Sequence, residues 1–266
     1  MRPRKRLGQN FLIDRNVLNR IVDAAAIEAG SSVLEIGGGF GVVTRELAAW
    51  AERVVCVEAD RALEAILRET LAGLENVEVV IADFLKLDLA RMIEERGGGK
   101  WVVVGNLPYY ITSPILVKLV EARRQLARMV LMVQREVADR LQARPGTDDY
   151  GALSVYVQYH CEMNSVLSVS RNVFYPVPEV DSELIRLVPR PSPPVAVQDE
   201  GLFFDIVRSA FGKRRKTLLN ALSSSAGLAW NRDRAERALT AAGINAGRRG
   251  ETLSMEEFAR IANAAT

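Results

Sequence analysis

Apolar residues in the first 188 positions alternate between short continuous runs and helical spacing. Short apolar runs predict buried strands, and apolar positions three and four residues apart predict the helices between them. Strands are predicted at 32–36, 53–58, 77–82, 101–105, 129–133 and 182–188, and helices at 14–28, from Val42, 62–71, 89–95, 115–120 and 135–142. Regular alternation requires right-handed crossover connections between parallel strands. We therefore expect an α/β domain with a mostly parallel sheet over residues 1–188.

The pattern changes at a proline-rich segment. Prolines at 189, 191, 193 and 194 make residues 189–199 a stiff linker. Beyond it the strand pattern does not recur, and helices are predicted at 203–211, 216–222, 234–242 and 255–262, the last capped by Ser254. We expect a small all-α C-terminal domain over residues 200–266.

Polar residues stand at the ends of four consecutive predicted strands. They are Glu35, Glu58, Asp83 and Asn106. The carboxyl ends of parallel strands meet at one edge of a sheet, where ligands of such folds bind. Glu58 also follows a glycine turn by a little under twenty residues, the position from which an acid accepts hydrogen bonds from ribose hydroxyls. Any one of these side chains could be a mere surface group, but four in this pattern favour a ligand site.

That glycine turn, residues 37–41, joins the strand 32–36 to a helix. Glycines let a backbone approach a ligand closely while it turns into a helix N-terminus. A nicotinamide-type dinucleotide fingerprint needs a glycine three residues after Gly39, and Val42 stands there. A dinucleotide site is therefore disfavoured, and an ordinary strand-to-helix loop without a ligand is the remaining alternative.

The tetrapeptide 106–109, Asn-Leu-Pro-Tyr, follows the apolar strand 101–105. Asn106 offers an amide oxygen, Pro108 fixes φ, and Tyr109 supplies a flat ring. Such a site suits a flat ring that carries an amino group, with Asn106 Oδ1 and the Leu107 carbonyl as acceptors of the amino hydrogens. The alternative is a strand followed by a simple proline turn.

Composition and charge narrow the class of protein. The chain has 266 residues, 48% of them apolar and 26% charged, which is typical of a globular protein with one sizeable core and a small second domain. No apolar run reaches membrane-spanning length, and the basic N-terminus lacks the apolar segment of a signal peptide. We expect a cytoplasmic monomer without a membrane partner. Two distant cysteines and a single histidine predict neither a metal site nor a disulfide framework.

Basic residues are clustered, although the formal net charge is only +2. Such clusters are candidates for phosphate contacts, and the alternative is a set of solvated faces. They comprise Arg2, Arg4, Lys5 and Arg6 at the N-terminus, then Lys213, Arg214, Arg215 and Lys216, then Arg248 and Arg249.

The run 5–12, Lys-Arg-Leu-Gly-Gln-Asn-Phe-Leu, closely resembles the N-terminal motif of the ribosomal RNA adenine N6-dimethyltransferases, the KsgA family of the small subunit. Other stretches resemble the same family in the same order along the whole chain. They are the glycine turn after Glu35, residues 106–109, residues 150–155, residues 172–182 and the basic run 211–218. One departure is Gly38, where many family members carry proline; it puts cofactor affinity in doubt rather than activity.

The resemblance implies a Rossmann-like class I fold that uses S-adenosyl-L-methionine (SAM), with residues 1–12 folding over the cofactor. Phe174 would stack on the target base from the face opposite Tyr109. The implied cofactor-binding residues are Asn10, Leu12, Gly37, Gly39, Glu58, Asp83 and Asn106. The implied catalytic residues are Asn106, Leu107, Pro108, Tyr109 and Phe174, and the implied RNA-binding residues are Lys213, Arg214, Arg215 and Lys216.

The function implied is N6,N6-dimethylation of two adjacent adenosines in the 3′-terminal hairpin of 16S rRNA, within the small ribosomal subunit or its precursor, with a role in subunit biogenesis. Three alternatives stay open at this point. The macrolide-resistance methyltransferases of large-subunit rRNA share the glycine turn and the Asn-Leu-Pro-Tyr strand end, although residues 150–151 and 214–217 favour the small-subunit branch. A DNA adenine methyltransferase shares the strand-end pattern, and a mainly non-catalytic assembly factor would share the RNA contacts.

Overall fold

The chain folds into two compact units in a computed structural model that describes residues 9–213 and 215–266. The first unit consists of Met1–Ala138 and Cys161–Pro189, and the second of Asp139–His160 and Arg190–Thr266. The segment 139–160, which the sequence analysis placed in the N-terminal domain, thus belongs to the second unit. Its buried residues Val155 and Tyr159 share an apolar cluster with Phe203 and other C-terminal side chains. Some of the basic residues that were predicted to contact phosphates lie outside the described residues. They are Arg2, Arg4, Lys5, Arg6 and Arg214.

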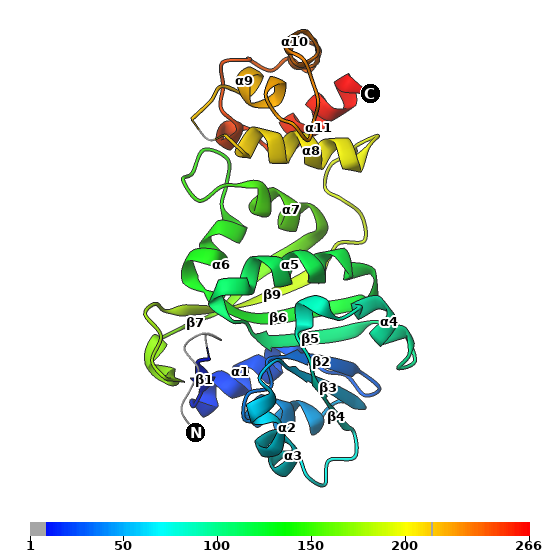
Figure 1. Cartoon of the computed structure of the whole chain (residues 1–266), viewed down its shortest axis with the longest axis vertical. Helices are drawn as coiled ribbons and strands as arrows, with labels where there is room; N and C mark the ends of the chain where they lie inside the picture. The colour runs from blue at the N-terminus through cyan, green and yellow to red at the C-terminus, as the bar shows by residue number, and fades with distance from the viewer. Residues whose placement is uncertain (1–8, 214) are drawn as a thin grey trace. The chain divides into compact units, whose positions relative to one another are not determined.

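A seven-stranded sheet forms the centre of the first unit (Figure 1), in the order β4-β3-β2-β5-β6-β9-β7. Strands β2 to β6 run parallel, and β9 is antiparallel to both of its neighbours, so the expected mostly parallel sheet is confirmed. The strands are β2 (Ser32–Ile36), β3 (Arg53–Glu58), β4 (Val77–Ile81), β5 (Trp101–Asn106), β6 (Leu126–Gln134), β7 (Cys161–Val169) and β9 (Ser182–Pro189).

Helices cover both faces of this sheet (Figure 1). α1 (Arg15–Ala25), α2 (Val42–Ala48) and α3 (Glu64–Thr70) lie on one side, and α4 (Leu89–Glu94) and α5 (Thr112–Glu121) on the other. Asp14 caps α1 as its sequence position predicts, but the helix ends before residue 28 because Ala26 adopts a left-handed conformation, with φ of 42°. The predicted helix 62–71 begins instead with a 3-10 turn, η2 (Arg61–Leu63).

Two parts of the first unit were not predicted as strands. β7 carries exposed polar side chains on much of its length and a register shift between Ser165 and Leu167, so its sequence lacks a clean two-residue alternation. β1 (Phe11–Leu12) and β8 (Phe174–Tyr175) form a separate antiparallel pair. A pair of two-residue strands leaves no periodicity to detect, because the pairing depends on contacts between distant segments.

Beyond the proline-rich segment, the described residues of the second unit form helices joined by loops, with no strand among them. α11 begins with a full capping box in which Ser254 and Glu257 satisfy each other's backbone N–H groups. Phe203, Trp230 and Phe258 anchor an apolar core. The helices are α6 (Arg135–Gln142), which starts in the first unit, α7 (Ala152–His160), α8 (Glu200–Phe211), α9 (Leu218–Ser223), α10 (Arg232–Ala241) and α11 (Met255–Ala265).

Within the described ranges, every helix is too short or too polar to cross a lipid bilayer.

Candidate active site

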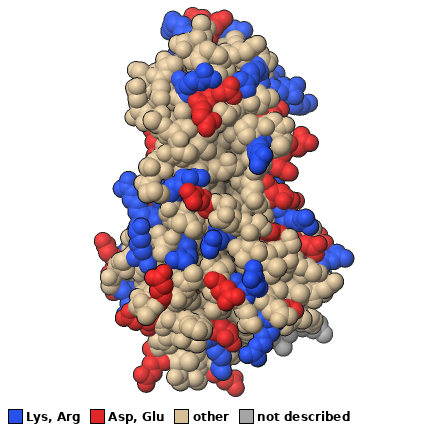
Figure 2. Space-filling view, turned by 180° about the vertical axis from the view of Figure 1, so that it is seen from behind, with Lys and Arg blue, Asp and Glu red and all other residues tan. Residues whose placement is uncertain are grey.

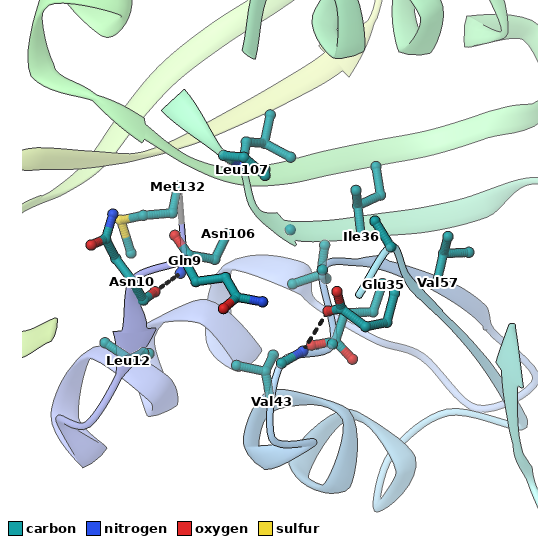
Figure 3. Close-up of a pocket in the computed structure, with 18 of the residues that line it drawn as sticks. Gln9, Asn10, Leu12, Glu35, Ile36, Val43, Val57, Asn106, Leu107 and Met132 are labelled. Carbon is teal, nitrogen blue, oxygen red and sulfur yellow. Dashed lines mark hydrogen bonds between the residues drawn. The ribbon is translucent and has the colours of Figure 1, made fainter. Parts of the chain in front are cut away.

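A pocket opens at the carboxyl ends of β2, β3, β4 and β5, within the first unit. All four polar strand-end residues predicted from the sequence, Glu35, Glu58, Asp83 and Asn106, line it, together with the glycine turn and residues 9–12. Figure 3 shows Gln9, Asn10 and Leu12 on one side of this pocket and Glu35 and Val57 on the other. The geometry therefore brings together residues that are far apart in the sequence, such as Gln9 and Asn106, which are 97 positions apart.

The glycine turn is fixed by hydrogen bonds to β3. The Gly37 N–H donates to the Val57 carbonyl at 2.8 Å, and the Gly39 N–H donates to Glu58 Oε2 at 3.0 Å. Gly39 has φ of 57°, which glycine adopts without strain. The turn thereby places its backbone against the acid that the sequence assigns to ribose hydroxyls.

Gly38 is surrounded more closely than either neighbour. A Cβ atom at this position would lie 2.1 Å from Cys56 Sγ. Cys56 is fully buried, and burial raises the pKa of its thiol, which also accepts a hydrogen bond from Thr44. The space that another side chain would take at residue 38 is therefore filled by the sulfur from β3, which explains how the chain departs from the family pattern at this residue without leaving a void.

Glu35 lies beneath the turn and is 2% exposed. Its Oε2 has no hydrogen-bond partner among the described residues. Burial raises the pKa of this carboxyl to about 8, and the nearby charge of Glu58 acts in the same direction, whereas a hydrogen bond with Thr44 opposes the rise. The side chain is thus held as a neutral acid at neutral pH.

Glu58 ends β3 with both carboxylate oxygens engaged. Oε1 accepts the Asp60 N–H at 2.7 Å, while Oε2 accepts the Gly39 N–H. Burial raises the pKa of Glu58, and these backbone hydrogen bonds partly offset the rise. Asp60 in turn accepts a hydrogen bond from Gln9 Nε2 at 2.8 Å. Each Glu58 oxygen keeps a further lone pair, so the group can still accept from a hydroxyl.

Asp83 follows β4 and is exposed at the pocket edge. Its Oδ1 accepts the Leu85 N–H at 3.0 Å and so caps the 3-10 turn η3 (Phe84–Lys86). The capping bond fixes the carboxylate by one oxygen. The second oxygen is the one available to a ligand amino group.

Residues 9–12, which we call the strap, border the pocket opposite the turn. Asn106 Nδ2 donates to the Asn10 carbonyl at 2.8 Å (Figure 3). The Phe11 ring stacks on Phe40 of the glycine turn, with centroids 4.1 Å apart. Leu12 pairs with Phe174 across the small β1–β8 sheet. The strap therefore contacts the glycine turn and the tetrapeptide 106–109 at once.

The Asn106 amide has one orientation in this arrangement. A backbone carbonyl only accepts, so the nitrogen of the amide must face Asn10. Its Oδ1 accepts no hydrogen bond from any residue in the described ranges. The Leu107 N–H is used by the Met132 carbonyl at 3.1 Å, and the Leu107 carbonyl likewise has no donor among those residues. Both residues line the pocket, and their role as acceptors of an amino group stays a prediction.

Tyr109 is held by a residue that the sequence analysis did not single out for the site. Its hydroxyl lies 2.8 Å from Ser182 Oγ at the start of β9, and burial raises the pKa of the phenol. Pro108 has φ of −60°, and its carbonyl accepts from the Ile111 N–H and from Thr112 Oγ1. The tyrosine ring is therefore fixed at both its backbone and its hydroxyl.

Phe174 lines the pocket but is only 1% exposed. Its ring packs with Val17, Ile21 and Leu184 in the core of the first unit. The side chain thus serves the core, which was the alternative role weighed for it. Its stacking on a target base stays a prediction.

The predicted RNA-binding cluster lies in the second unit, between α8 and α9. Lys213, Arg215 and Lys216 are exposed, and Lys213 Nζ bonds to the carbonyl and hydroxyl of Ser224. Their role in RNA binding stays a prediction.

Three residues that hold the site were missed by sequence reasoning: Gln9, Asp60 and Ser182. Gln9 and Ser182 lie inside motifs that the sequence analysis quoted, so their neighbours pointed to them, whereas Asp60 carries no local signal. Within the described residues, no group of three or more His, Cys, Asp or Glu side chains could hold a metal ion.

Comparison with known proteins gives similarity over nearly the full chain. A family model described as ribosomal RNA adenine dimethylase matches residues 1–266. Ribosomal RNA small subunit methyltransferase A of Bacillus mycoides is 51% identical over 264 residues, covering 98% of this chain and 90% of the relative. The protein of the same description from Moorella thermoacetica is 52% identical over 265 residues, covering 97% and 91%.

Two solved structures resemble the whole chain. A dimethyladenosine transferase from Plasmodium falciparum has a TM-score of 0.76 at 27% identity, covering 94% of this chain and 95% of that one. The 23S rRNA methyltransferase ErmE has a TM-score of 0.71 at 32% identity, covering 96% and 99%. Both similarities extend over the two units described above.

Proposed function

This chain belongs to the ribosomal RNA adenine dimethylase family, and we propose that it uses SAM to dimethylate N6 of two adjacent adenosines in the 3′-terminal hairpin of small-subunit rRNA. It is a small-subunit rRNA adenine dimethyltransferase by its close similarity to two proteins of that description. The particular adenosines, the residues that act on them and a monomeric state belong to the proposal.

The observation that carries the proposed chemistry is a pair of acceptors at the end of β5 that line the pocket and have no donor among the described residues. The amino nitrogen of adenine shares its lone pair with the ring, so it is a poor nucleophile in its planar form. Asn106 Oδ1 and the Leu107 carbonyl have no donor among the described residues and can take its two hydrogens, which favours a tetrahedral nitrogen with its lone pair free to attack. After the first methylation one N–H remains, and one acceptor suffices for the second.

The polar groups that line the pocket also suit the polar groups of SAM. Glu58 is fixed where its remaining lone pairs can accept from ribose hydroxyls, and Asp83 keeps one oxygen for an adenine amino group. Gly37 and Gly39 keep side chains out of the turn. Asn10 and Leu12 close the pocket from the strap. When bound, SAM supplies a methyl group on a cationic sulfur that departs as a neutral thioether.

No strong base is required of the protein. The proton lost from the methylated nitrogen is acidic enough to pass to water, so the residues contribute mainly by position. Tyr109, fixed by Ser182, offers a ring face to a base that has left its stack, and such stacking is worth ~1–3 kcal/mol.

Asn106→Ala tests this role. We expect turnover to fall by at least ~100-fold, because an acceptor that acts in the transition state is removed, while SAM affinity changes only a few-fold. The assay uses labelled SAM with small subunits from cells that lack the modification, followed by nucleoside analysis. Asn19→Ala, at an exposed position of α1, is the matched control.

The same assay separates the alternatives. Near-normal turnover by Asn106→Ala would remove Asn106 from the acceptor role. Dimethyladenosine in large subunits or in DNA, but not in small subunits, would overturn the proposed substrate. Binding of small subunits by the wild-type protein without any methylation would select an assembly factor instead.

A further inference from the structure

Lys118 reaches from α5 to the turn that follows β4. Its Nζ donates to the carbonyls of Phe84 and Leu85, each at 2.9 Å, and to the carbonyl of Leu87. All three acceptors belong to η3 or to the residue after it. An ammonium group has three N–H donors, so its whole hydrogen-bonding capacity is directed at one turn of backbone.

Neighbouring carboxylates and an aromatic ring also surround the Lys118 ammonium. Burial lowers the pKa of Lys118, and the carboxylates of Asp83, Asp88 and Glu121 oppose that change. The Nζ atom also lies 5.2 Å from the centre of the Phe84 ring, which is 5% exposed. A cation at the carboxyl end of η3 meets the negative end of that turn's peptide dipoles.

The turn that Lys118 holds is the one that presents Asp83. Asp83 caps η3 through Oδ1, so the direction of its second oxygen depends on the shape of the turn. Removing the ammonium would leave the carbonyls of Leu85 and Leu87 without a donor among the described residues, and the Phe84 carbonyl would keep only the Leu87 N–H at 3.3 Å. A turn that has lost these bonds is free to change its backbone angles next to Asp83, which would redirect the second carboxylate oxygen.

Lys118 also belongs to the helix that follows the tetrapeptide 106–109. Thr112 Oγ1, in the first turn of α5, donates to the Pro108 carbonyl, and Ile115 lines the pocket one turn before Lys118. One helix therefore contacts the tetrapeptide at its start and the Asp83 turn near its end.

We propose that Lys118 is a positioning residue that aims the free Asp83 oxygen at the amino group of the donor's adenine and ties this turn to the helix carrying the target-base segment. This inference rests on the proposed function, because it assumes that the donor's adenine lies at Asp83. Lys118 acts through Asp83 and does not itself touch the donor.

Ligand binding without catalysis tests the proposal. The probes are S-adenosylhomocysteine and S-inosylhomocysteine, in which a keto oxygen replaces the adenine amino group, and calorimetry gives both affinities. We expect the wild-type protein to prefer the adenosyl ligand by roughly tenfold or more, because the inosyl base offers Asp83 an acceptor in place of a donor. In Lys118→Met this preference should shrink to about threefold or less, mainly by weaker adenosyl binding.

Lys86→Met is the matched control, since Lys86 lies in the same turn but is exposed. It loses the same charge and should keep the wild-type preference. Asp83→Asn should lose the preference as well, and adding Lys118→Met to it should cause little further loss. Should Lys118→Met fail to fold, Lys118→Arg replaces it. Its N–H donors lie in a plane on a longer side chain and do not radiate from the single position that Lys118 Nζ occupies, so a loss of preference of at least about threefold is again expected.

Each outcome decides one point. A full wild-type preference in a folded Lys118→Met or Lys118→Arg protein would overturn the positioning role. A wild-type protein that binds both ligands equally would overturn it too, because Asp83 would then not recognise the amino group. A wild-type protein that binds neither ligand would instead contradict the proposed use of SAM.

Discussion

At the scale of single residues, the carboxyl group of Glu35 gives the fold a dependence on pH. Its pKa of about 8, raised from 4.5, means that the folded state keeps a proton that the unfolded chain has lost. Between those two values stability falls as pH rises, by up to ~1.4 kcal/mol for each pH unit. Below pH 4.5 the group is protonated in both states and contributes no slope.

Glu35→Gln should remove this dependence. The neutral amide has no proton to lose, so the melting temperature of the variant should not share the wild-type decrease between about pH 5 and about pH 8.5. The difference in melting temperature, variant minus wild type, should therefore grow with pH over this range, whatever its value at about pH 5. Thermal unfolding across that range measures the difference. Glu69→Gln, at an exposed position of α3, is the control and should follow the wild type. Parallel curves for Glu35→Gln and the wild type would show that Glu35 is ionised in the folded state.

The grouping of polar residues at the strand ends could be predicted, because the carboxyl ends of parallel strands meet at one edge of a sheet. Asn106, Glu58 and Asp83 line one pocket as expected. The contact between Gly38 and Cys56 could not be predicted, because the two residues are 18 positions apart and meet only through the register of β2 and β3. Burial of the Phe174 ring was weighed as an alternative, while the family resemblance implied a stacking role, which stays a prediction.

At the scale of elements, the strap is a short segment held by contacts of three kinds. A side-chain hydrogen bond joins it to Asn106, an aromatic stack joins it to Phe40, and a two-residue strand pair joins it to β8. Most helices, and the strands other than β1, β7 and β8, were predicted to within about three residues of their ends, but helix α7 was not predicted. β1, β7 and β8 were not predicted either, since their positions depend on partners far along the chain rather than on their own pattern.

Phe11→Ala should loosen the strap at the glycine turn. An aromatic pair contributes ~0.5–1.5 kcal/mol beyond its buried area, so we expect affinity for S-adenosylhomocysteine to fall roughly threefold to tenfold. Calorimetry measures it, with Ile13→Ala as the control because Ile13 is 68% exposed. Equal affinities for Phe11→Ala and the wild type would mean that the stack does not support the pocket.

At the scale of the whole molecule, the positions of the charged residues say more about RNA binding than the formal net charge of +2 does. Figure 2 shows Lys and Arg side chains mixed with Asp and Glu over the face that it draws, with several basic side chains close together at its left edge. The cluster at Lys213, Arg215 and Lys216 is exposed and belongs to the second unit. Exposed cations that meet phosphates release counterions, so their contribution to binding decreases with salt.

Charge reversal at Arg215 and Lys216 should therefore weaken RNA binding and flatten its salt dependence, by about one unit of slope for each phosphate that is no longer neutralised. Filter binding of small-subunit rRNA over a range of salt concentrations measures both effects. Arg237→Glu, on the exposed side of α10 in the same unit, changes charge without touching the cluster. An unaltered slope in the double variant would assign the cluster to a solvated surface.

The chain passes between the two units three times, after residues 138, 160 and 189. A single cut at the proline-rich segment therefore does not release an independent domain. It strips the apolar cover from Val155 and Tyr159, which stay behind on α7 with their C-terminal partners gone. We expect a fragment truncated at this point to expose apolar surface and to aggregate, so that it would not act as a smaller enzyme.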